Sequence, residues 1–133
     1  MPINKDEKGE RLAYVINYSE MKVLIVDPGS LSFLEEIAKD LKSLEVIFMT
    51  GDAGSVPAEI GGVRTLPFST FDKFGTDNTG VEVTIKDMER CMFTSGTTGM
   101  PKGVARNHGG VVMTVRAYLQ QQGVRSGDVL MSI

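Results

Sequence analysis

Two short apolar runs on either side of one amphipathic stripe constrain the fold of this 133-residue chain most strongly. Val23–Val26 and Val46–Met49 are apolar at every position, which is typical of strands buried on both faces of a parallel sheet. Between them, apolar residues recur at the spacing of one helix face, at Leu31, Leu34, Ile37, Ala38 and Leu41. Strand, helix and strand in this order predict a βαβ unit and an α/β fold with mostly parallel βαβ layers.

The remaining elements are expected around this unit. Leu12, Val15 and Ile16 predict a helix from Glu7 to about Tyr18. Ser30 is a candidate N-cap for the helix of the βαβ unit. Residues 51–88 are rich in glycine and turn residues and predict a surface connection with one or two short strands.

The last third of the chain predicts five further segments. Residues 90–94 read as a third strand, and 102–108 as extended chain. A helix is expected from about 109 to 122, with Val111, Val112, Val115 and Leu119 on one face. Residues 123–128 read as a turn, and 129–133 begin another apolar strand. The chain therefore divides into 1–66 (helix plus βαβ unit), 67–88 (connection) and 89–133.

Composition excludes several classes of protein. The net charge of −3 argues against general nucleic-acid binding. No apolar run reaches the length of a membrane span, and the polar N-terminus does not resemble a signal peptide, so a cytoplasmic location is the default. The single cysteine, Cys91, is most simply a buried core residue rather than a nucleophile. The single histidine, His108, has no Cys or His cluster around it in sequence to form a metal site.

Charge is distributed unevenly along the chain. Residues 1–88 contain 9 Lys/Arg and 15 Asp/Glu, a net charge of −6, whereas residues 89–133 contain 5 and 2, a net charge of +3.

The segment "FTSGTTGMPKGV", residues 93–104, lies in this basic part and contains six consecutive Thr, Ser or Gly residues. Glycines allow backbone N–H groups to converge on an anion, and hydroxyls and Lys102 add donors and charge. These features predict a loop that holds a polyphosphate. It is neither a Walker P-loop nor a G-x-G-x-x-G dinucleotide loop, because its spacings differ.

The same segment resembles the signature of the adenylate-forming superfamily, which includes acyl-CoA synthetases, aryl-CoA ligases, luciferases and peptide-synthetase adenylation domains. The resemblance extends through "KDMERCMFTSGTTG" and "GVARNHGGVVMTVRAY" to "GVRSGDVLMSI", and upstream to "ERLAYVINYSEMKVLIVD". It covers nearly the whole chain and is weakest over residues 51–86. The upstream part is most like a fatty or medium-chain acyl-CoA synthetase. The resemblance implies that the chain is part of the large N-terminal domain of such a ligase.

The resemblance also implies a function. These enzymes join a carboxylic acid to ATP, giving an acyl-adenylate and pyrophosphate, and then pass the acyl group to CoA. The residues matching the positions that contact the ATP phosphates are Thr94, Ser95, Gly96, Thr97, Thr98, Gly99 and Lys102. Mg²⁺ would accompany the ATP. His108 and Arg106 also lie in the matched region; we expect a helix-start contact for the former and a solvated strand charge for the latter.

Other groups that the family needs are not found in this sequence. They are an adenine-side aromatic motif, a ribose-binding aspartate, the CoA site and a catalytic lysine. Thr50-Gly51-Asp52 precedes the loop, so it reads as a strand end and turn instead of the ribose site. We therefore expect a fragment without catalytic residues of its own, inactive alone and prone to self-association through its exposed apolar surfaces. A free-standing ATP- or polyphosphate-binding module and a non-catalytic interaction domain remain the alternatives.

Overall fold

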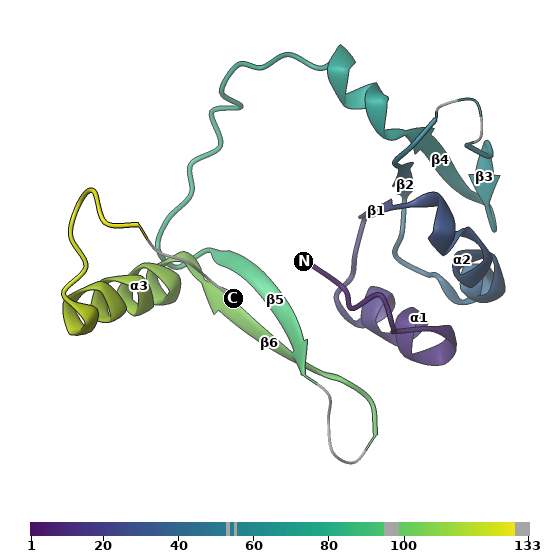
Figure 1. The fold of residues 1–133 in the computed structure, drawn as a ribbon. Helices are drawn as coiled ribbons and strands as arrows, with labels where there is room; N and C mark the ends of the chain where they lie inside the picture. The colour runs from purple at the N-terminus through teal and green to yellow at the C-terminus, as the bar shows by residue number, and fades with distance from the viewer. Residues whose placement is uncertain (53, 55, 95–98, 130–133) are drawn as a thin grey trace.

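A four-stranded sheet forms the centre of the N-terminal half. The computed structural model describes residues 1–52, 54, 56–94 and 99–129. The strands are β1 (Val23–Val26), β2 (Val46–Met49), β3 (Glu59–Ile60) and β4 (Val63–Pro67), in the order β1-β2-β4-β3. β2 pairs in parallel with both β1 and β4, and only the short β3 is antiparallel. The predicted α/β fold with a mostly parallel sheet is confirmed (Figure 1).

Two helices pack on one face of this sheet. α1 (Gly9–Tyr18) buries Leu12, Val15 and Ile16, the residues that predicted it. α2 (Leu31–Ile37) contributes Leu34 and Ile37 to the same core, which Ile47 and Met49 of β2 complete. The apolar spacing predicted a helix that continues to Leu41, but α2 ends at Ile37. The chain then forms a tighter 3-10 turn, η2 (Ala38–Asp40). Ser30 precedes α2 as expected, but its hydroxyl donates to Asp27 Oδ2 (3.2 Å) and makes no cap bond.

The two apolar strands differ in their surroundings. β2 is buried on both faces: Ile47 points to the helices, while Phe48 packs on Phe71 with ring centroids 4.5 Å apart. β1 is an edge strand, and Val23 and Ile25 remain 47% and 53% exposed. The expectation that both runs are buried on two faces is therefore right for β2 and wrong for β1. A continuous apolar run does not reveal whether another element covers its second face.

The segment after β2 contains more structure than a surface connection. The sequence predicted one or two short strands here, and two form, but β4 lies inside the sheet, beside β2. Thr65 of β4 is buried, and its neighbour Val63 belongs to the core. A short 3-10 helix, η4 (Phe68–Lys73), then carries Phe71 onto the sheet. Residues 75–87 contain no helix or strand and run on to the second sheet (Figure 1).

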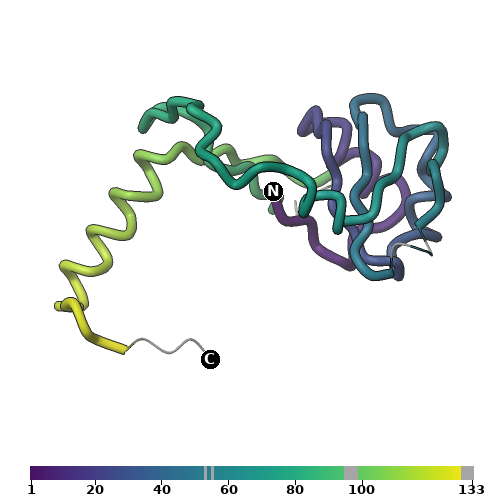
Figure 2. The backbone as a smooth tube through the Cα atoms, turned by 90° about the horizontal axis from the view of Figure 1, so that it is seen from above, coloured from purple at the N-terminus to yellow at the C-terminus, as the bar shows by residue number. Residues whose placement is uncertain are grey.

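A two-stranded hairpin and a helix form the remainder of the described chain. β5 (Met88–Thr94) pairs antiparallel with β6 (Lys102–Asn107), and α3 (His108–Gln122) follows at once. Asn107 caps α3 by accepting a hydrogen bond from the Gly110 N–H (2.7 Å), and Gly123 ends it at φ +65°. Figure 2 shows α3 extending away from the N-terminal sheet. All three elements were predicted within two residues of their bounds.

The apolar face predicted for α3 is present but not buried. Val112 and Val115 are 46% and 49% exposed, while Val111 and Leu119 are partly covered. Periodicity predicts which side chains share a face, and it does not say what covers that face. The turn predicted at 123–128 forms, with the Arg125 N–H donating to Asp128 Oδ2 (2.7 Å). The sequence also predicts a strand that begins at Val129. Residues 130–133 of this strand lie outside the described residues.

Candidate functional site

The β5–β6 hairpin brings the two ends of the predicted phosphate loop together. Thr94 ends β5, Lys102 begins β6, and the two residues are direct cross-strand partners. The Thr94 hydroxyl donates a long hydrogen bond of 3.4 Å to the Lys102 carbonyl. Both side chains are exposed. The four central positions of the predicted site, Ser95, Gly96, Thr97 and Thr98, lie outside the described residues.

The exit of the loop combines a glycine turn with a buried proline. Gly99 has a φ of +147°, a conformation that side chains rarely allow, and among the described residues no atom beyond its chain neighbour lies within 4 Å of where its Cβ would be. Pro101 is buried although its neighbours Met100 and Lys102 are exposed. Met100 helps to line a groove of about 510 Å³ between α1 and α2, together with Ala13, Tyr14 and other residues. The loop exit therefore lies against α1.

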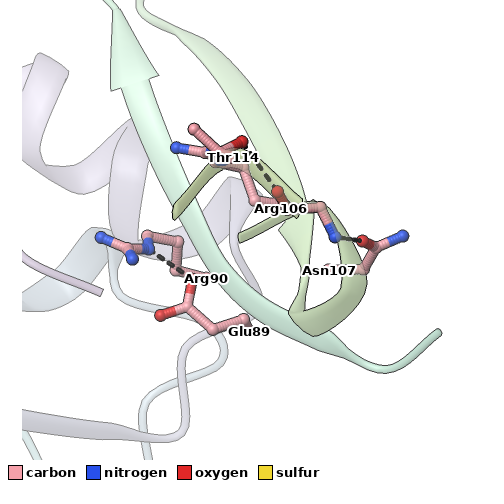
Figure 3. Close-up of polar contacts among 6 residues, drawn as sticks. Glu89, Arg90, Arg106, Asn107 and Thr114 are labelled. Carbon is pink, nitrogen blue, oxygen red and sulfur yellow. Dashed lines mark hydrogen bonds and ion pairs between the residues drawn. The ribbon is translucent and has the colours of Figure 1, made fainter. Parts of the chain in front are cut away.

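Three cations share one face of the hairpin. Because side chains alternate along strands, Arg90 and Thr94 of β5 point to the same side as Lys102 and Arg106 of β6. Arg90 forms an ion pair with Glu89, and Arg106 donates to Thr114 Oγ1 of α3 (3.3 Å; Figure 3). Arg106 is half-buried and bonded within the fold, rather than the solvated charge expected from sequence. Lys102, the third cation, lies at the mouth of the loop with its side chain exposed.

Asp87 and His108 lie where the hairpin meets α3. The backbone N–H of His108 donates to the Asp87 carbonyl (3.1 Å). Any residue at this helix start could make this bond, so the contact expected of the histidine itself stays a prediction. The Asp87 carboxylate accepts from the Thr84 N–H (2.6 Å), and this bond, with the Thr84 hydroxyl and the His108 charge, lowers the pKa of Asp87. These contacts close the base of the hairpin, at the opposite end from the loop.

Cys91 occupies an intermediate position, and the expectation of a buried core residue is wrong. It is partly exposed on β5 and lines a cavity of about 730 Å³ beside β1 and the first residues of the chain. Strand β1 contributes Leu24 and Val26 to the same lining, whereas Thr94, Gly99 and Lys102 lie outside it. This cavity is largely hydrocarbon, and the described residues of the predicted phosphate loop do not line it.

Two residues that support the hairpin and α3 were not identified from the sequence. Asn107 has a recognisable signal, since Asn directly before a helix is a preferred N-cap. Tyr18 has none: it ends α1 and meets Phe93 of β5 edge to face, with ring centroids 6.0 Å apart. Contacts between residues 75 positions apart in the chain cannot be predicted from local pattern. Thr50-Gly51-Asp52 does form the predicted strand end and turn, with the Thr50 N–H donating to the Val26 carbonyl (2.8 Å) and Gly51 at φ +93°.

Two other kinds of feature are not found in the described residues. No helix there is both long enough and apolar enough to cross a membrane. No cluster of three or more His, Cys, Asp or Glu side chains suited to a metal ion occurs among them.

Comparison with known proteins gives a consistent result. The family model described as "AMP-binding enzyme" matches residues 1–133. A 3-hydroxybenzoate/4-hydroxybenzoate–CoA ligase from Thauera aromatica is 30% identical over 86% of this chain and 21% of its own length. Long chain acyl-CoA synthetase 8 from Arabidopsis thaliana is 30% identical over 84% of this chain and 16% of its own. The chain thus spans about a fifth of the curated relatives it matches.

A solved structure shares the fold. The anthranilate CoA ligase AuaEII, in complex with anthranoyl-AMP, aligns with a TM-score of 0.73 and 29% identity, over 86% of this chain and 21% of that chain. The relatives named for aryl acids and for fatty acids match at the same identity of 30%. Identity therefore does not support the finer expectation of a fatty acyl-CoA synthetase over an aryl-CoA ligase.

Proposed function

The chain belongs to the AMP-binding enzyme family, and from this premise we propose that it carries the ATP phosphate-binding loop of an ATP-dependent acyl- or aryl-CoA ligase. In the proposed reaction a carboxylate attacks the α-phosphate of ATP, the bond to the β-phosphate breaks, and an acyl-adenylate and pyrophosphate form. The acyl group then passes to the thiol of CoA, releasing AMP. Negative charge develops on phosphate oxygens, so placement and electrostatic stabilisation supply most of the catalysis.

The geometry of the hairpin mouth is the observation that carries the proposal. Thr94 and Lys102 are cross-strand partners, so a donor hydroxyl and a cation flank the same loop. Gly99 turns the chain in open space, which allows a ligand to approach the backbone closely. The proposed phosphate contacts are Thr94, Ser95, Gly96, Thr97, Thr98, Gly99 and Lys102.

The same proposal includes Mg²⁺ and the two other substrates, CoA and the carboxylic acid. The described residues contain no acidic cluster for a metal ion, so we propose that Mg²⁺ arrives bound to the ATP phosphates. CoA and the carboxylic acid would bind largely to parts of the enzyme that this chain does not include, since the chain spans about a fifth of its relatives.

Calorimetry with MgATP tests the phosphate-binding role. Lys102→Ala should weaken binding about tenfold or more, because a charge-assisted hydrogen bond to phosphate is lost. Lys73→Ala, which removes an exposed lysine of η4, is the matched control and should leave the affinity unchanged. An affinity that Lys102→Ala leaves intact would contradict the role of the loop.

The same measurements separate the alternative functions. We propose that the chain binds ATP but does not turn it over, because the adenine-side, ribose-side and lysine groups of the family are not found in it. Pyrophosphate release with a panel of carboxylic acids should be absent. Turnover by this chain alone would overturn the proposal of an inactive part, and the absence of ATP binding would favour the non-catalytic interaction domain.

A narrower proposal concerns the acid. We propose a fatty or medium-chain acid, because the segment "ERLAYVINYSEMKVLIVD" resembles fatty or medium-chain acyl-CoA synthetases more than peptide-synthetase domains. A competition assay of octanoate against benzoate, with the complete enzyme that contains this segment, tests this choice. A preference for benzoate would reject it without affecting the phosphate-binding role.

Self-association is proposed from the exposed apolar side chains. Val23 and Ile25 of β1 and Val112 and Val115 of α3 are each more than two-fifths exposed. Burying such surface between copies is favourable. Sedimentation at increasing concentration should reveal oligomers, and a monomer at all concentrations would contradict the proposal.

A further inference from the structure

An aromatic contact joins the two halves of the molecule next to the phosphate loop. Tyr18, the last residue of α1, meets Phe93 of β5 with ring planes at 78°, and it stacks on Tyr14 at 5.3 Å. Phe93 is paired with Gly103, and the next pair along the hairpin is Thr94 with Lys102, where the loop begins. Tyr18 therefore contacts the hairpin one residue pair away from the loop.

Gly103 shows how close this approach is. A Cβ at this position would lie 3.2 Å from Cys91 Sγ, 3.3 Å from Tyr18 Cε1 and 3.4 Å from Phe93 Cζ. Such distances are shorter than ordinary van der Waals contacts, so the space beside Gly103 is already filled. The face of the hairpin opposite the three cations therefore lies against the tyrosine ring, and the glycine permits it.

The end of α1 that carries Tyr18 is itself firmly held. Asn17 Nδ2 donates to the Asp40 carbonyl (2.7 Å), and Asn17 Oδ1 accepts from the Lys42 N–H (2.9 Å). Val15 and Ile16, in the same turn, are 2% and 0% exposed. Tyr18 thus extends from a fixed point of the N-terminal core.

The hairpin needs such a support. It forms a sheet of two strands, separate from the four-stranded sheet, and none of the hydrophobic side chains of β5 and β6 themselves is fully buried. An isolated two-stranded hairpin is at best marginally stable in water. A loop that binds phosphate must hold its donors in place, so loosening the hairpin would weaken binding.

We propose that Tyr18 is a positioning residue for the phosphate loop: it holds the β5–β6 hairpin against α1 through Phe93 and the space left by Gly103. It does not itself touch the nucleotide. The expected effect on ATP binding rests on the proposed function. The contact between Tyr18 and the hairpin can be tested without any ligand.

The experiment compares Tyr18→Ala, Tyr18→Phe and the control Tyr118→Ala, which removes an exposed tyrosine of α3. Hydrogen–deuterium exchange should rise several-fold over residues 90–94 and 102–106 in Tyr18→Ala and stay unchanged over 46–49. MgATP affinity should fall about two- to tenfold, since an aromatic pair is lost. Tyr18→Phe, which keeps the ring, should restore both, and Tyr118→Ala should change neither hairpin exchange nor affinity.

The outcomes separate the two proposals. If the unaltered chain does not bind MgATP, the proposed function fails, yet exchange in the hairpin still decides the role of Tyr18. If exchange and affinity in Tyr18→Ala equal those of the unaltered chain, the positioning role is wrong. Faster exchange over residues 46–49 as well would show a general loss of stability and would also overturn it.

Discussion

The N-terminal sheet and the β5–β6 hairpin with α3 are built by different means. Apart from Pro101, all the buried apolar residues of the described chain lie between Leu12 and Val63, in and around the four-stranded sheet. The hairpin and α3 are defined by backbone pairing, a side-chain N-cap and a glycine C-cap, and their apolar side chains are at most partly buried. The difference shows that the part carrying the proposed phosphate loop depends on local hydrogen bonds and on a few contacts with the better-packed part.

The largest effect is expected from the core of the N-terminal sheet. Ile47 of β2 is fully buried, so Ile47→Ala should lower the free energy of unfolding by about 2–5 kcal/mol through lost burial and a cavity. Chemical denaturation measures this change. Ile25→Ala in the exposed edge strand is the control, and its cost should be about 1 kcal/mol or less. Equal costs at the two sites would contradict the difference in burial between β1 and β2.

A somewhat smaller effect is expected where the chain turns tightly beside α2. Gly61 has a φ of +60°, and a Cβ there would lie 2.1 Å from the Cβ of Ala38. Gly61→Ala should therefore cost about 2–3 kcal/mol of unfolding free energy, from backbone strain and overpacking together. Gly62→Ala provides the comparison, because Gly62 also has a positive φ but open space around it. If thermal denaturation shows the same loss of stability in both variants, the close packing of Gly61 on Ala38 is wrong.

In the second region, local hydrogen bonds should carry the stability. Asn107→Ala removes the N-cap of α3 and should destabilise the helix by about 1 kcal/mol. Hydrogen exchange over residues 108–122 should become faster while α1 is unaffected. The matched control is Asn78→Ala, whose side chain caps a turn in the connection by accepting from Gly80 N–H (3.0 Å). Unchanged exchange in α3 would mean that the cap contributes nothing there.

The smallest effect is the loss of stability expected at the base of the hairpin as the pH is lowered. Hydrogen bonds from Thr84 lower the folded-state pKa of Asp87, so its contribution to stability is present above its unfolded pKa of about 3.9 and is lost as the pH falls through the folded value. Exchange at the base of the hairpin should therefore increase slightly in acid. Glu7, whose hydrogen bond to Arg11 lowers its pKa, acts in the same direction in the N-terminal half. Asp87→Asn separates the two contributions. In this variant the increase in hydrogen exchange in acid should disappear at the base of the hairpin but remain in the N-terminal half.

Much of the fold could be predicted because it follows from local pattern. The apolar runs located β1 and β2 to the residue, and helical periodicity located α1 and α3. The Thr/Ser/Gly segment with Lys102 indicated the candidate site before any strand pairing was known. The match of the whole chain to the AMP-binding family agrees with the family that this segment indicated, while its role as a phosphate site stays a prediction.

Other features were decided only by tertiary structure. Local sequence sets backbone preference and shared faces, whereas burial depends on which distant segment packs alongside. For this reason sequence could not show that β4 enters the sheet beside β2, that Ile25 and the apolar face of α3 remain exposed, or that Cys91 lines a cavity. The sequence likewise predicted an anion-binding loop within residues 93–104, but only packing between distant segments set Tyr18 of α1 against the hairpin that contains this segment.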